Sequence, residues 1–564
     1  MKKLNLLVFI LSFIGITATK AQYHDVMSFN GANPYQGQDP NAGVYLSGNT
    51  LYGMTYRGGA PNLGVIYKVN TDGTGYMDMH EFTSQPDGEV PQNTLTMSGG
   101  VLYGIVGSGG AYYDGCIIKI NPDGTGYQDI YDFTESCDPE GELIIVGSTM
   151  YGMTEFGGVN GAGSIFNIST SGTGYTDIYS FTSATGAVPQ GDLLLSGSTF
   201  YGTCSGDGAN YGGCVFSVQT DGSNYKDLFD FNGTNGSTPQ GTLIISNGVL
   251  YGTTASGGSG GYGTVFSIHP DGSDFKTLHN FTGHSDGDEP YGGALAQIGG
   301  TLYGTTYQGG DFYSEGTLYS VDTNGSGYTQ LWQFTDSTGN TPFKVTLAVN
   351  GDVLYGTGGG GGKYGDGVVF KYVACNLGAT ANVVNEVMCN GQSSGAVTAG
   401  TSGGTAPFTY SWSSGGNTNQ TVSGLSAGTY TVSIHDANNC SASASVTLTQ
   451  PGALSGSIAS QVNVLCAGSS TGSATANVAT GGTSPYAYSW SPAGGTNLTA
   501  SNLSAGIYTL TITDGNNCSA TTSVTITQPT TLIAHAGVIN YVTCNGSSNG
   551  RATATPTGGT SPFT

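Results

Sequence analysis

The sequence predicts an all-β protein in which a seven-bladed β-propeller is followed by tandem immunoglobulin-like β-sandwich repeats. Two repeats with different periods carry this prediction: a unit of about 50 residues fills residues 22–373, and a unit of 77 to 78 residues follows it. The composition agrees. The 97 glycines suit many short strands joined by tight turns, while 35 Tyr and 21 Phe argue against disorder, because disordered chains are poor in aromatic residues.

The first 21 residues have the features of a secretory signal peptide. Lys2 and Lys3 form a basic end, residues 4–16 are apolar, and Thr19 and Ala21 suit a cleavage site. No later apolar run approaches the roughly 18 residues of a membrane span, so no transmembrane helix is expected. The mature protein is therefore expected to be extracellular, either secreted or attached to the cell surface.

Each unit of the first repeat contains four short extended runs. In the fifth unit these are "GTLIIS", "VLYGTT", "TVFSI" and "DFKTLHNF". A Tyr-Gly pair marks the second run of every unit, at Tyr52, Tyr103, Tyr151, Tyr201, Tyr251, Tyr303 and Tyr355. Four strands in about 50 residues are typical of a propeller blade, and a β-solenoid is the alternative.

The ends of the repeat region favour the propeller. The last unit stops after its third run, "GVVFKYV", and the missing fourth run stands at the start of the mature chain as "YHDVMSF". A solenoid has no reason to divide one unit between its ends. We therefore expect Tyr23–Phe29 to pair with Val368–Tyr372, which closes the ring and removes a free sheet edge.

Antiparallel geometry places the two long connections of every unit on one face of the ring. These are the glycine loop between the second and third runs and the connection from the fourth run to the next unit; the tight Asp-Gly turns lie opposite. A binding site is expected on this long-loop face. The glycine loops lack the Gly-Lys-Ser/Thr ending of a phosphate-binding loop and open no helix, so turn chemistry explains them best.

Several glycine loops carry an aromatic residue that can stack on a sugar ring or a partner side chain. The predicted ligand-binding residues are Tyr112, Tyr211, Tyr262, Tyr313 and Tyr364, and Tyr113 lies beside the first of them. The alternative is that these tyrosines pack on neighbouring loops. The whole region from Tyr23 to Val373 resembles the GloVer-type tandem repeat of secreted bacterial proteins, through "LYGTTASGG", "GTVFSI" and the "DG…Y" element. That resemblance implies no chemistry.

Beyond residue 373, Ser, Thr, Ala and Asn replace glycine, and apolar and polar residues alternate cleanly. This alternation predicts half-buried strands, with Trp412 and Trp490 filling the cores of small sandwiches. The units are similar to SprB repeats, through "GGTAPFTYSW", "LSAGTYTVSIHDANNC" and "LTQP". We assign residues 374–386 to a linker, and 387–452, 464–530 and 542–564 to repeats, the third of them cut short.

The SprB resemblance implies display on the cell surface, through a type IX secretion route, in an adhesive or spacer role. The sorting domain that this route reads is not visible, and the chain stops inside a repeat. We therefore expect the sequence to be a piece of a longer protein.

Ten cysteines in an exported chain favour disulfides. The natural pairs are Cys389 with Cys440 and Cys466 with Cys518, each within one repeat. In the propeller, Cys204 and Cys214 flank one glycine loop, and Cys116 and Cys137 fall on the long-loop face of one unit. Cys375 has no evident partner, and a partner of Cys544 would lie outside this sequence.

The net charge of −24 disfavours nucleic acid and anionic membranes, which need clustered Lys and Arg. Arg57 alone cannot supply the arginine cluster of a sialidase. His279 and His284 have no standard metal spacing. The paired acids of "DGDEP" and "CDPEGE" are expected in solvated turns, although acid–base chemistry or calcium binding are alternatives. No catalytic residue, metal site or cofactor is predicted.

These observations predict an exported binding or adhesion protein, expected to be a monomer, with a neutral glycan or a surface protein as its partner. The alternatives are a glycan-active hydrolase or lyase with its site at the central opening of the propeller, and a purely structural stalk. Non-repeating polar residues at the channel mouth would favour the enzyme. An aromatic long-loop face would favour binding, and a face of glycine and serine the stalk.

Overall fold

Each unit of the first repeat forms one four-stranded antiparallel sheet. The computed structural model describes residues 23–31, 33, 36–83, 85–134, 137–283, 285–310 and 315–564; the predicted signal peptide lies outside them. In the fifth unit the strands are β20 (Ile244–Ser246), β21 (Val249–Thr254), β22 (Thr264–Ile268) and β23 (Lys276–Asn280). They pair in chain order, as the four extended runs predict.

We call these sheets blades 1 to 7. The strands of the other blades are, for blade 1, β3 (Tyr45–Ser47), β4 (Thr50–Thr55), β6 (Val65–Asn70) and β7 (Met77–Glu81); for blade 2, β8 (Thr96–Ser98), β9 (Val101–Val106), β10 (Cys116–Ile120) and β11 (Gln128–Asp132); for blade 3, β12 (Pro139–Val146), β13 (Thr149–Thr154), β14 (Ser164–Ser169) and β15 (Thr176–Ser180); for blade 4, β16 (Leu194–Ser196), β17 (Thr199–Cys204), β18 (Cys214–Gln219) and β19 (Lys226–Asp230); for blade 6, β24 (Ala296–Ile298), β25 (Thr301–Thr306), β26 (Thr317–Asp322) and β27 (Thr329–Gln333); and for blade 7, β28 (Ala348–Asn350), β29 (Val353–Gly358), β30 (Val368–Val373) and β1 (Tyr23–Ser28).

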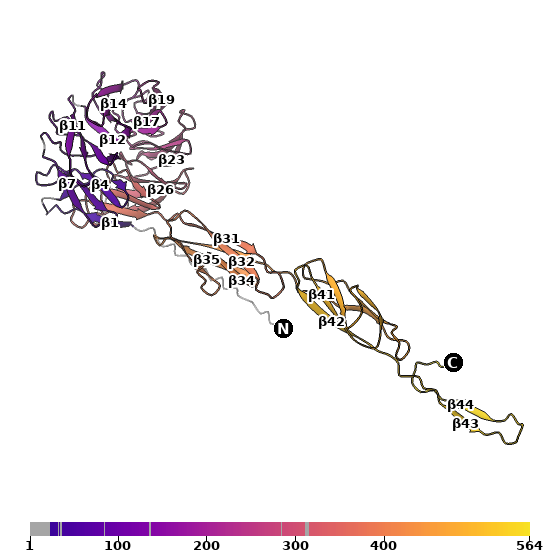
Figure 1. Ribbon diagram of the computed structural model, residues 1–564. Coiled ribbons are helices and arrows are strands. Elements are labelled where there is room, and N and C mark those ends of the chain that lie inside the picture. The colour runs from indigo at the N-terminus through magenta and orange to yellow at the C-terminus, as the bar shows by residue number, and fades with distance from the viewer. Residues whose placement is uncertain are drawn as a thin grey trace, which may run out of the picture. The chain divides into compact units, whose positions relative to one another are not determined.

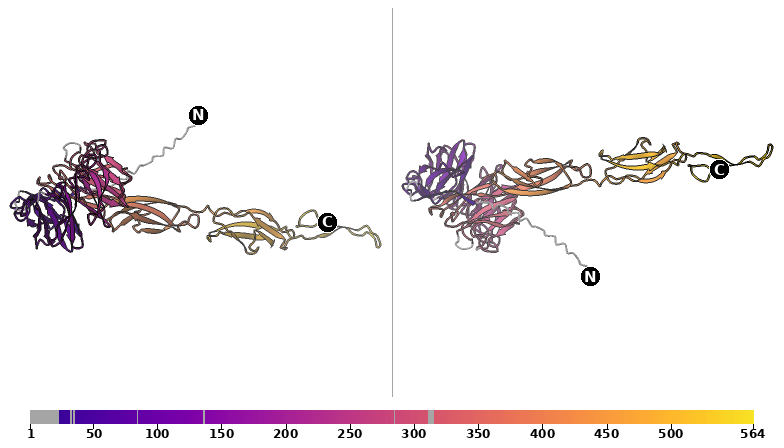
Figure 2. Two further views of the ribbon diagram at one scale, coloured as in Figure 1. Left: turned by 90° about the horizontal axis from the view of Figure 1, so that it is seen from above. Right: turned by 90° about the horizontal axis from the view of Figure 1, so that it is seen from below.

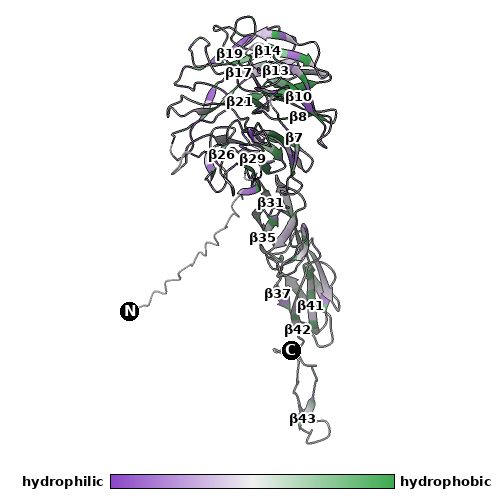
Figure 3. Ribbon diagram, turned by 90° about the vertical axis from the view of Figure 1, so that its left-hand side faces the viewer, coloured by the Kyte–Doolittle hydropathy of each residue, from purple (hydrophilic) through white to green (hydrophobic). Residues whose placement is uncertain are grey.

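The N-terminal strand completes blade 7. β1 pairs antiparallel with β30, with Tyr23 opposite Tyr372 and Ser28 opposite Val368, so the predicted pairing is confirmed. Consecutive blades share apolar clusters, and one of these clusters joins Val369 of blade 7 to Val65 of blade 1. The sheets therefore follow one another around a closed ring (Figure 1). Apolar residues concentrate on strands such as β10 and β21 (Figure 3).

The repeated motifs have packing reasons. In the "LYG" of blade 5, the glycine lies under an aromatic ring of the third strand: a Cβ on Gly252 would lie 2.7 Å from Phe266 Cζ. The aromatic residue that begins the fourth run stacks on a ring of the preceding blade. The described stacked pairs and their centroid distances are Tyr127–His80 at 3.5 Å, Tyr175–Tyr131 at 4.8 Å, Tyr225–Tyr179 at 4.4 Å, Phe275–Phe229 at 3.9 Å, Tyr328–His279 at 3.7 Å and Tyr23–Trp332 at 4.5 Å.

Hydrogen bonds between loops join the long connections into one surface. The connection that enters blade 5 donates from Thr238 N to Gly212 O in the glycine loop of blade 4, at 2.9 Å. It also donates from Ser237 N to Ser256 O in the glycine loop of its own blade, at 2.7 Å. A short pair, β2 (Gly37–Gln38) with β5 (Arg57–Gly58), lies in the loops of blade 1.

The second region contains two complete repeats, each with two three-stranded antiparallel sheets (Figure 2). The first repeat has β31 (Gly378–Asn385), β32 (Gly395–Ser402) and β34 (Thr421–Leu425) in one sheet, and β33 (Thr409–Trp412), β35 (Gly428–His435) and β36 (Ser441–Leu448) in the other. The second has β37 (Ile458–Val462), β38 (Gly472–Ala476) and β40 (Thr499–Leu503), then β39 (Ala487–Ser491), β41 (Gly506–Thr513) and β42 (Ser519–Ile526). The pair β43 (Ala536–Asn540) and β44 (Arg551–Ala554) begins a third.

Trp412 and Trp490 are buried in the two cores, as predicted, at 2% and 5% exposure. Each indole N–H donates to a backbone carbonyl at 3.0 Å, that of Asn419 or Asn497. The predicted linker, residues 374–386, is corrected: most of it is β31, which pairs along β32 and belongs to the first repeat. The six strands of each repeat are one fewer than in an immunoglobulin constant domain.

The disulfides of the repeats differ from the predicted pairs. Cys440 is bonded to Cys375 and Cys518 to Cys389, with Cα–Cα distances of 5.3 and 5.7 Å. Cys440 directly precedes the eight-residue strand β36, while the Cys389 loop lies at its far end, where Val387 N donates to Thr449 O at 3.2 Å. Such a strand is about 25 Å long, too far for a bond between Cys389 and Cys440. β42 separates Cys466 from Cys518 in the same way, since Val464 N donates to Thr527 O at 3.0 Å.

The predicted propeller disulfides are also wrong, because the described disulfides include neither Cys116–Cys137 nor Cys204–Cys214, and all four side chains are buried. Cys116 and Cys137 belong to different apolar clusters, one shared with blade 1 and one with blade 3. Cys204 and Cys214 are directly opposite in β17 and β18. Burial raises the pKa of Cys204 well above its usual value, so the reactive thiolate is disfavoured there.

Candidate functional site at the mouth of the central channel

A ring of side chains surrounds the channel on the long-loop face. A proline stands before the first strand of each blade, or begins it in blade 3, and the residue after that proline occupies a corresponding place in each: Asn41, Gln92, Glu140, Gln190, Gln240, Tyr291 and Phe343. We call these residues the mouth ring. The repeat fixes their positions but not their identities. The ring therefore has a polar side over blades 1 to 5 and an aromatic side over blades 6 and 7.

The polar side is joined by hydrogen bonds and one ion pair. Gln240 Nε2 donates to Gln190 Oε1 at 2.6 Å, and Gln190 Nε2 donates to Glu155 Oε1 at 3.1 Å. Lys344 Nζ, next to the ring in blade 7, lies 2.6 Å from Glu140 Oε2 in blade 3. Blades 3 and 7 are not neighbours, so this largely buried ion pair crosses the channel.

Two carboxylic acids lie below the mouth ring. Asp192 Oδ1 accepts from Glu142 N at 2.5 Å, and Asp192 Oδ2 accepts from Thr242 Oγ1 at 2.7 Å. Burial, and then the neighbouring Asp192, raise the pKa of Glu142 to about 8, and burial raises the pKa of Asp192. The space beside Asp192 and Lys344 is about 10 Å³, enough for about one water molecule.

The aromatic side of the mouth ring borders a pocket of about 380 Å³. Its lining residues are Asp39, Asn41, Tyr56, Gln92, Tyr307, Thr341, Phe343, Gly359 and Gly360. Tyr307 and Phe343 meet edge to face at 5.7 Å, and Tyr291 stacks on Phe343 at 4.8 Å. Half-buried rings beside amide and carboxyl groups can hold a small ligand that has both apolar faces and hydroxyls.

Arg57 lies at the edge of this pocket. Its Nε is 3.8 Å from Asp39 Oδ2, and its guanidinium carbon is 5.7 Å from the centre of the Tyr56 ring. Burial raises the pKa of the Asp39 carboxyl, and the charge of Arg57 opposes that rise. At the pocket rim the Arg57 guanidinium can donate hydrogen bonds and the Asp39 carboxylate can accept them.

The described loop tyrosines of the sequence prediction do not line this pocket. Tyr112, Tyr211, Tyr262 and Tyr364 are 59%, 85%, 39% and 47% exposed and belong to four different blades. Other residues line the pocket. Tyr262 lies against Gly283, and Lys363 Nζ is 4.9 Å from the Tyr364 ring centre. Tyr313 and His284 lie outside the described residues. A role for these tyrosines as ligand contacts stays a prediction.

Sequence reasoning missed the residues that do converge. Tyr56 and Tyr307 occupy the position four residues after the Tyr of the Tyr-Gly pair, where other blades have Gly107, Glu155, Ser205, Ala255 and Gly359. At this position and at the mouth ring, the side chain differs from one repeat unit to the next although the position within the unit is the same. Comparing the units position by position would have identified both.

The acidic residues of "CDPEGE" and "DGDEP" lie in different surroundings. In "CDPEGE", Asp138 is exposed as expected, whereas Glu140 is paired with Lys344 and burial raises the pKa of Glu142. Asp286 of "DGDEP" holds a turn: its carboxylate accepts from Thr282 Oγ1 at 2.6 Å and lies 3.1 Å from His279 Nε2. His80 and Asp87 form the same pair at 3.0 Å in blade 1, so these histidines have a packing role.

Family comparisons match both repeat regions. Residues 13–144 and 136–314 match the Gloeobacter/Verrucomicrobia repeat. Residues 381–417, 458–495 and 536–564 match the SprB repeat. No curated protein matches the chain. In the described ranges, no helix is long and apolar enough to cross a membrane.

Three similar solved structures have low sequence identity to this chain. An oligogalacturonate lyase in complex with manganese is 10% identical, covers 63% of this chain and 98% of its own, and gives a TM-score of 0.41. The oligogalacturonate lyase of Vibrio parahaemolyticus is 11% identical, with 63% and 94% coverage and a TM-score of 0.39. A Mycobacterium tuberculosis puromycin-hydrolyzing peptidase is 11% identical, with 60% and 53% coverage and a TM-score of 0.41.

Proposed function

The chain belongs to the family of the Gloeobacter/Verrucomicrobia repeat, and from this premise we propose that it is an exported adhesion protein. In this proposal the propeller binds a neutral saccharide at its channel mouth, and the SprB repeats serve as the stalk. SprB repeats and disulfides are typical of extracellular and surface proteins, which supports the exported location.

The observation that carries the proposal is the pocket of about 380 Å³ beside the mouth ring. Its volume lies within the range of small-ligand sites. Tyr56, Tyr307 and Phe343 offer ring faces for the apolar side of a sugar, and Asn41 and Gln92 offer amide groups for its hydroxyls. A neutral ligand is favoured, because the chain carries a net charge of −24 and one acid, Asp39, lines the pocket.

Catalysis is the second candidate, supported by Glu142. A carboxyl group with a pKa near 8 beside a second acid is suited to general acid–base chemistry. The Lys344–Glu140 ion pair lies across the channel, however, and the space beside Asp192 has room for about one water molecule. We favour binding because this space is too small for a sugar ring, whereas the pocket beside the mouth ring measures about 380 Å³.

A glycan array, followed by calorimetric titration of each hit, tests the proposal with the chain from residue 23 onwards. We expect Tyr307→Ala and Phe343→Ala to weaken binding of the hit by at least about tenfold, the equivalent of losing about 1.4 kcal/mol of stacking. Tyr211→Ala is the matched control and should bind like wild type, since Tyr211 is the most exposed of the predicted loop tyrosines that the structure describes and does not line the pocket.

The other outcomes favour other functions. Loss of binding in Tyr211→Ala but not in Tyr307→Ala would move the site to the glycine loops. Release of shorter saccharides during incubation, abolished by Glu142→Gln, would favour the enzyme. Absence of binding across neutral glycans would favour the stalk.

A further inference from the structure

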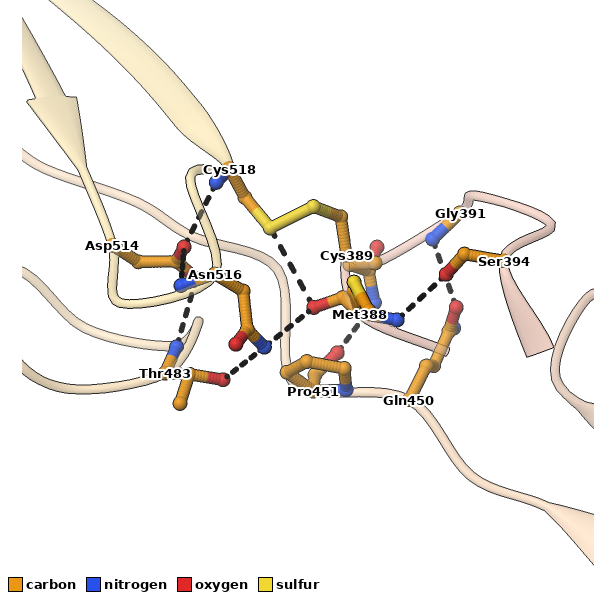
Figure 4. Close-up of a disulfide and its surroundings, with 11 residues drawn as sticks. Met388, Cys389, Gly391, Ser394, Gln450, Pro451, Thr483, Asp514, Asn516 and Cys518 are labelled. Atoms are coloured by element: carbon orange, nitrogen blue, oxygen red, sulfur yellow. Dashed lines mark hydrogen bonds between the residues drawn. A yellow bond between two sulfur atoms is a disulfide. The ribbon is translucent and has the colours of Figure 1, made fainter. Parts of the chain in front are cut away.

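The Cys389–Cys518 disulfide belongs to a wider contact between two loops (Figure 4). We call residues 386–394 the first loop of the first repeat and residues 514–518, "DGNNC", the second loop of the second repeat. Asn516 Nδ2 donates to Met388 O at 3.0 Å, beside the disulfide. Asp514 Oδ1 accepts from Asn516 N and Cys518 N, each at 2.9 Å, which fixes the shape of the second loop.

One backbone hydrogen bond recurs in the first loops of all three repeats, and a second recurs in the first two. The backbone N–H three residues after each first-loop cysteine donates to the carbonyl of Cys389, Cys466 or Cys544, at 3.1 Å in all three. Gly391 N donates to Gln450 Oε1, and Gly468 N to Gln528 Oε1, both at 2.8 Å. The first loop of the second repeat, residues 463–471, therefore has the geometry of the loop that binds a partner in the first repeat.

The occupied and unoccupied first loops differ in exposure. Cys389 is bonded and 9% exposed, whereas Cys466 is an exposed free thiol. Leu465, the counterpart of Met388, is 72% exposed. Both described disulfides follow one rule: the cysteine of a second loop is bonded to a cysteine that precedes its own repeat in the chain. Cys440 of the first repeat is bonded to Cys375, and Cys518 of the second repeat is bonded to Cys389.

We propose that the first loop of an SprB repeat is a docking and disulfide site for the Asp-x-Asn-Asn-Cys loop of a further SprB repeat. Cys466 takes such a loop, as Cys389 takes the loop of Cys518. The backbone carbonyl of Leu465 accepts the hydrogen bond that Met388 O accepts in the described contact. The partner is recognised by its asparagine as well as by its thiol.

The bond forms by thiol–disulfide exchange with an oxidised protein dithiol. One substrate thiolate attacks the disulfide of the oxidant and forms a mixed disulfide. The second substrate thiolate displaces it, so the new S–S bond forms while both sulfurs of the oxidant leave reduced. The two substrate thiols lose two protons and two electrons in total.

Non-reducing peptide mapping of the protein purified from its producing cells tests the proposal. We expect the peptide of Cys466 to be linked to a peptide with an Asp-x-Asn-Asn-Cys sequence. A free Cys466, or a bond to Cys544 or to glutathione, would overturn the proposal. Non-reducing electrophoresis separates the two sources of the partner loop: a single-chain band places it in the same chain, and a ladder removed by reductant places it in another molecule.

A variant of the described contact tests the role of the asparagine. Asn516→Ala should let the Cys389–Cys518 bond reduce at a several-fold lower dithiothreitol concentration, because it removes the hydrogen bond to Met388 O. Ser519→Ala, the neighbouring residue, is the matched control. Equal reduction of both variants and wild type would contradict recognition by the asparagine.

Discussion

Glu142 is held where its ionisation is costly. The carboxyl is enclosed in the channel near Asp192, and Thr96 Oγ1 donates to its Oε1 at 2.8 Å. Burial and the second acid raise its pKa from 4.5 to about 8 in the folded protein. The folded state therefore binds more protons than the unfolded state between about pH 4.5 and pH 8. The stability that this group contributes is present below pH 4.5 and is lost as the pH rises through 8.

This sign gives a prediction for Glu142→Gln. Between pH 5 and pH 8.5, the free energy of unfolding of the wild-type propeller should fall with rising pH by a few kcal/mol more than that of the variant, since each pKa unit corresponds to about 1.4 kcal/mol. Urea titrations at several pH values across this window measure the difference. Parallel pH profiles of the two proteins would contradict the raised pKa.

At the scale of the strand, the segments that lead into the first strands of neighbouring blades lie against one another, and this explains Gly191, Gly241 and Gly293, which follow the mouth-ring residues of blades 4, 5 and 6 by one or two positions. A Cβ on Gly191 would lie 2.9 Å from Gly241 O, and one on Gly241 would lie 3.1 Å from Gly293 O. A Cβ on Gly293 would lie only 2.2 Å from Val345 O. Each obstacle is a backbone atom of the next blade, so it cannot move aside cheaply.

Gly293→Ala should therefore destabilise the propeller by about 1–3 kcal/mol, the usual cost of overpacking. Gly300→Ala is the matched control: a Cβ there meets nothing within 4 Å, so its effect should be within about 1 kcal/mol and can be stabilising. Thermal unfolding of both variants measures the difference. Equal melting temperatures would show that the first strands have room to separate.

The strands could be predicted because each unit repeats its own pattern. The run "TVFSI" is β22 without a residue added or lost. The disulfides could not be predicted from the spacing of the cysteines along the sequence. Cys389 and Cys440 belong to one repeat but lie at opposite ends of one strand, and the sequence spacing does not show this separation in space. The pocket could not be predicted from loop aromatics either. Tyr56 and Phe343 are 287 positions apart in the chain, and only ring closure brings them to one pocket.

At the scale of the whole ring, stability depends on one strand from the far end of the chain. Phe29, directly after β1, is fully buried, and Tyr23 stacks on Trp332. Without β1, the edge of β30 is unpaired and the apolar cluster between blades 7 and 1 loses Phe29.

A chain that begins at residue 31 should consequently unfold about 10 °C below one that begins at residue 23. Exposing the sites of two or three buried side chains costs on the order of 5 kcal/mol, and 1 kcal/mol corresponds to about 2–4 °C in a large domain. Differential scanning calorimetry of the propeller transition measures the shift.

Removing residues 536–564, a longer segment outside the ring, is the control and should leave that transition in place. A synthetic peptide of residues 23–30 added in excess should raise the melting temperature of the shortened chain, because it can pair with the open edge of β30. An unchanged transition in the shortened chain would mean that the blades hold one another without closure, and the pocket beside the mouth ring would then not depend on β1.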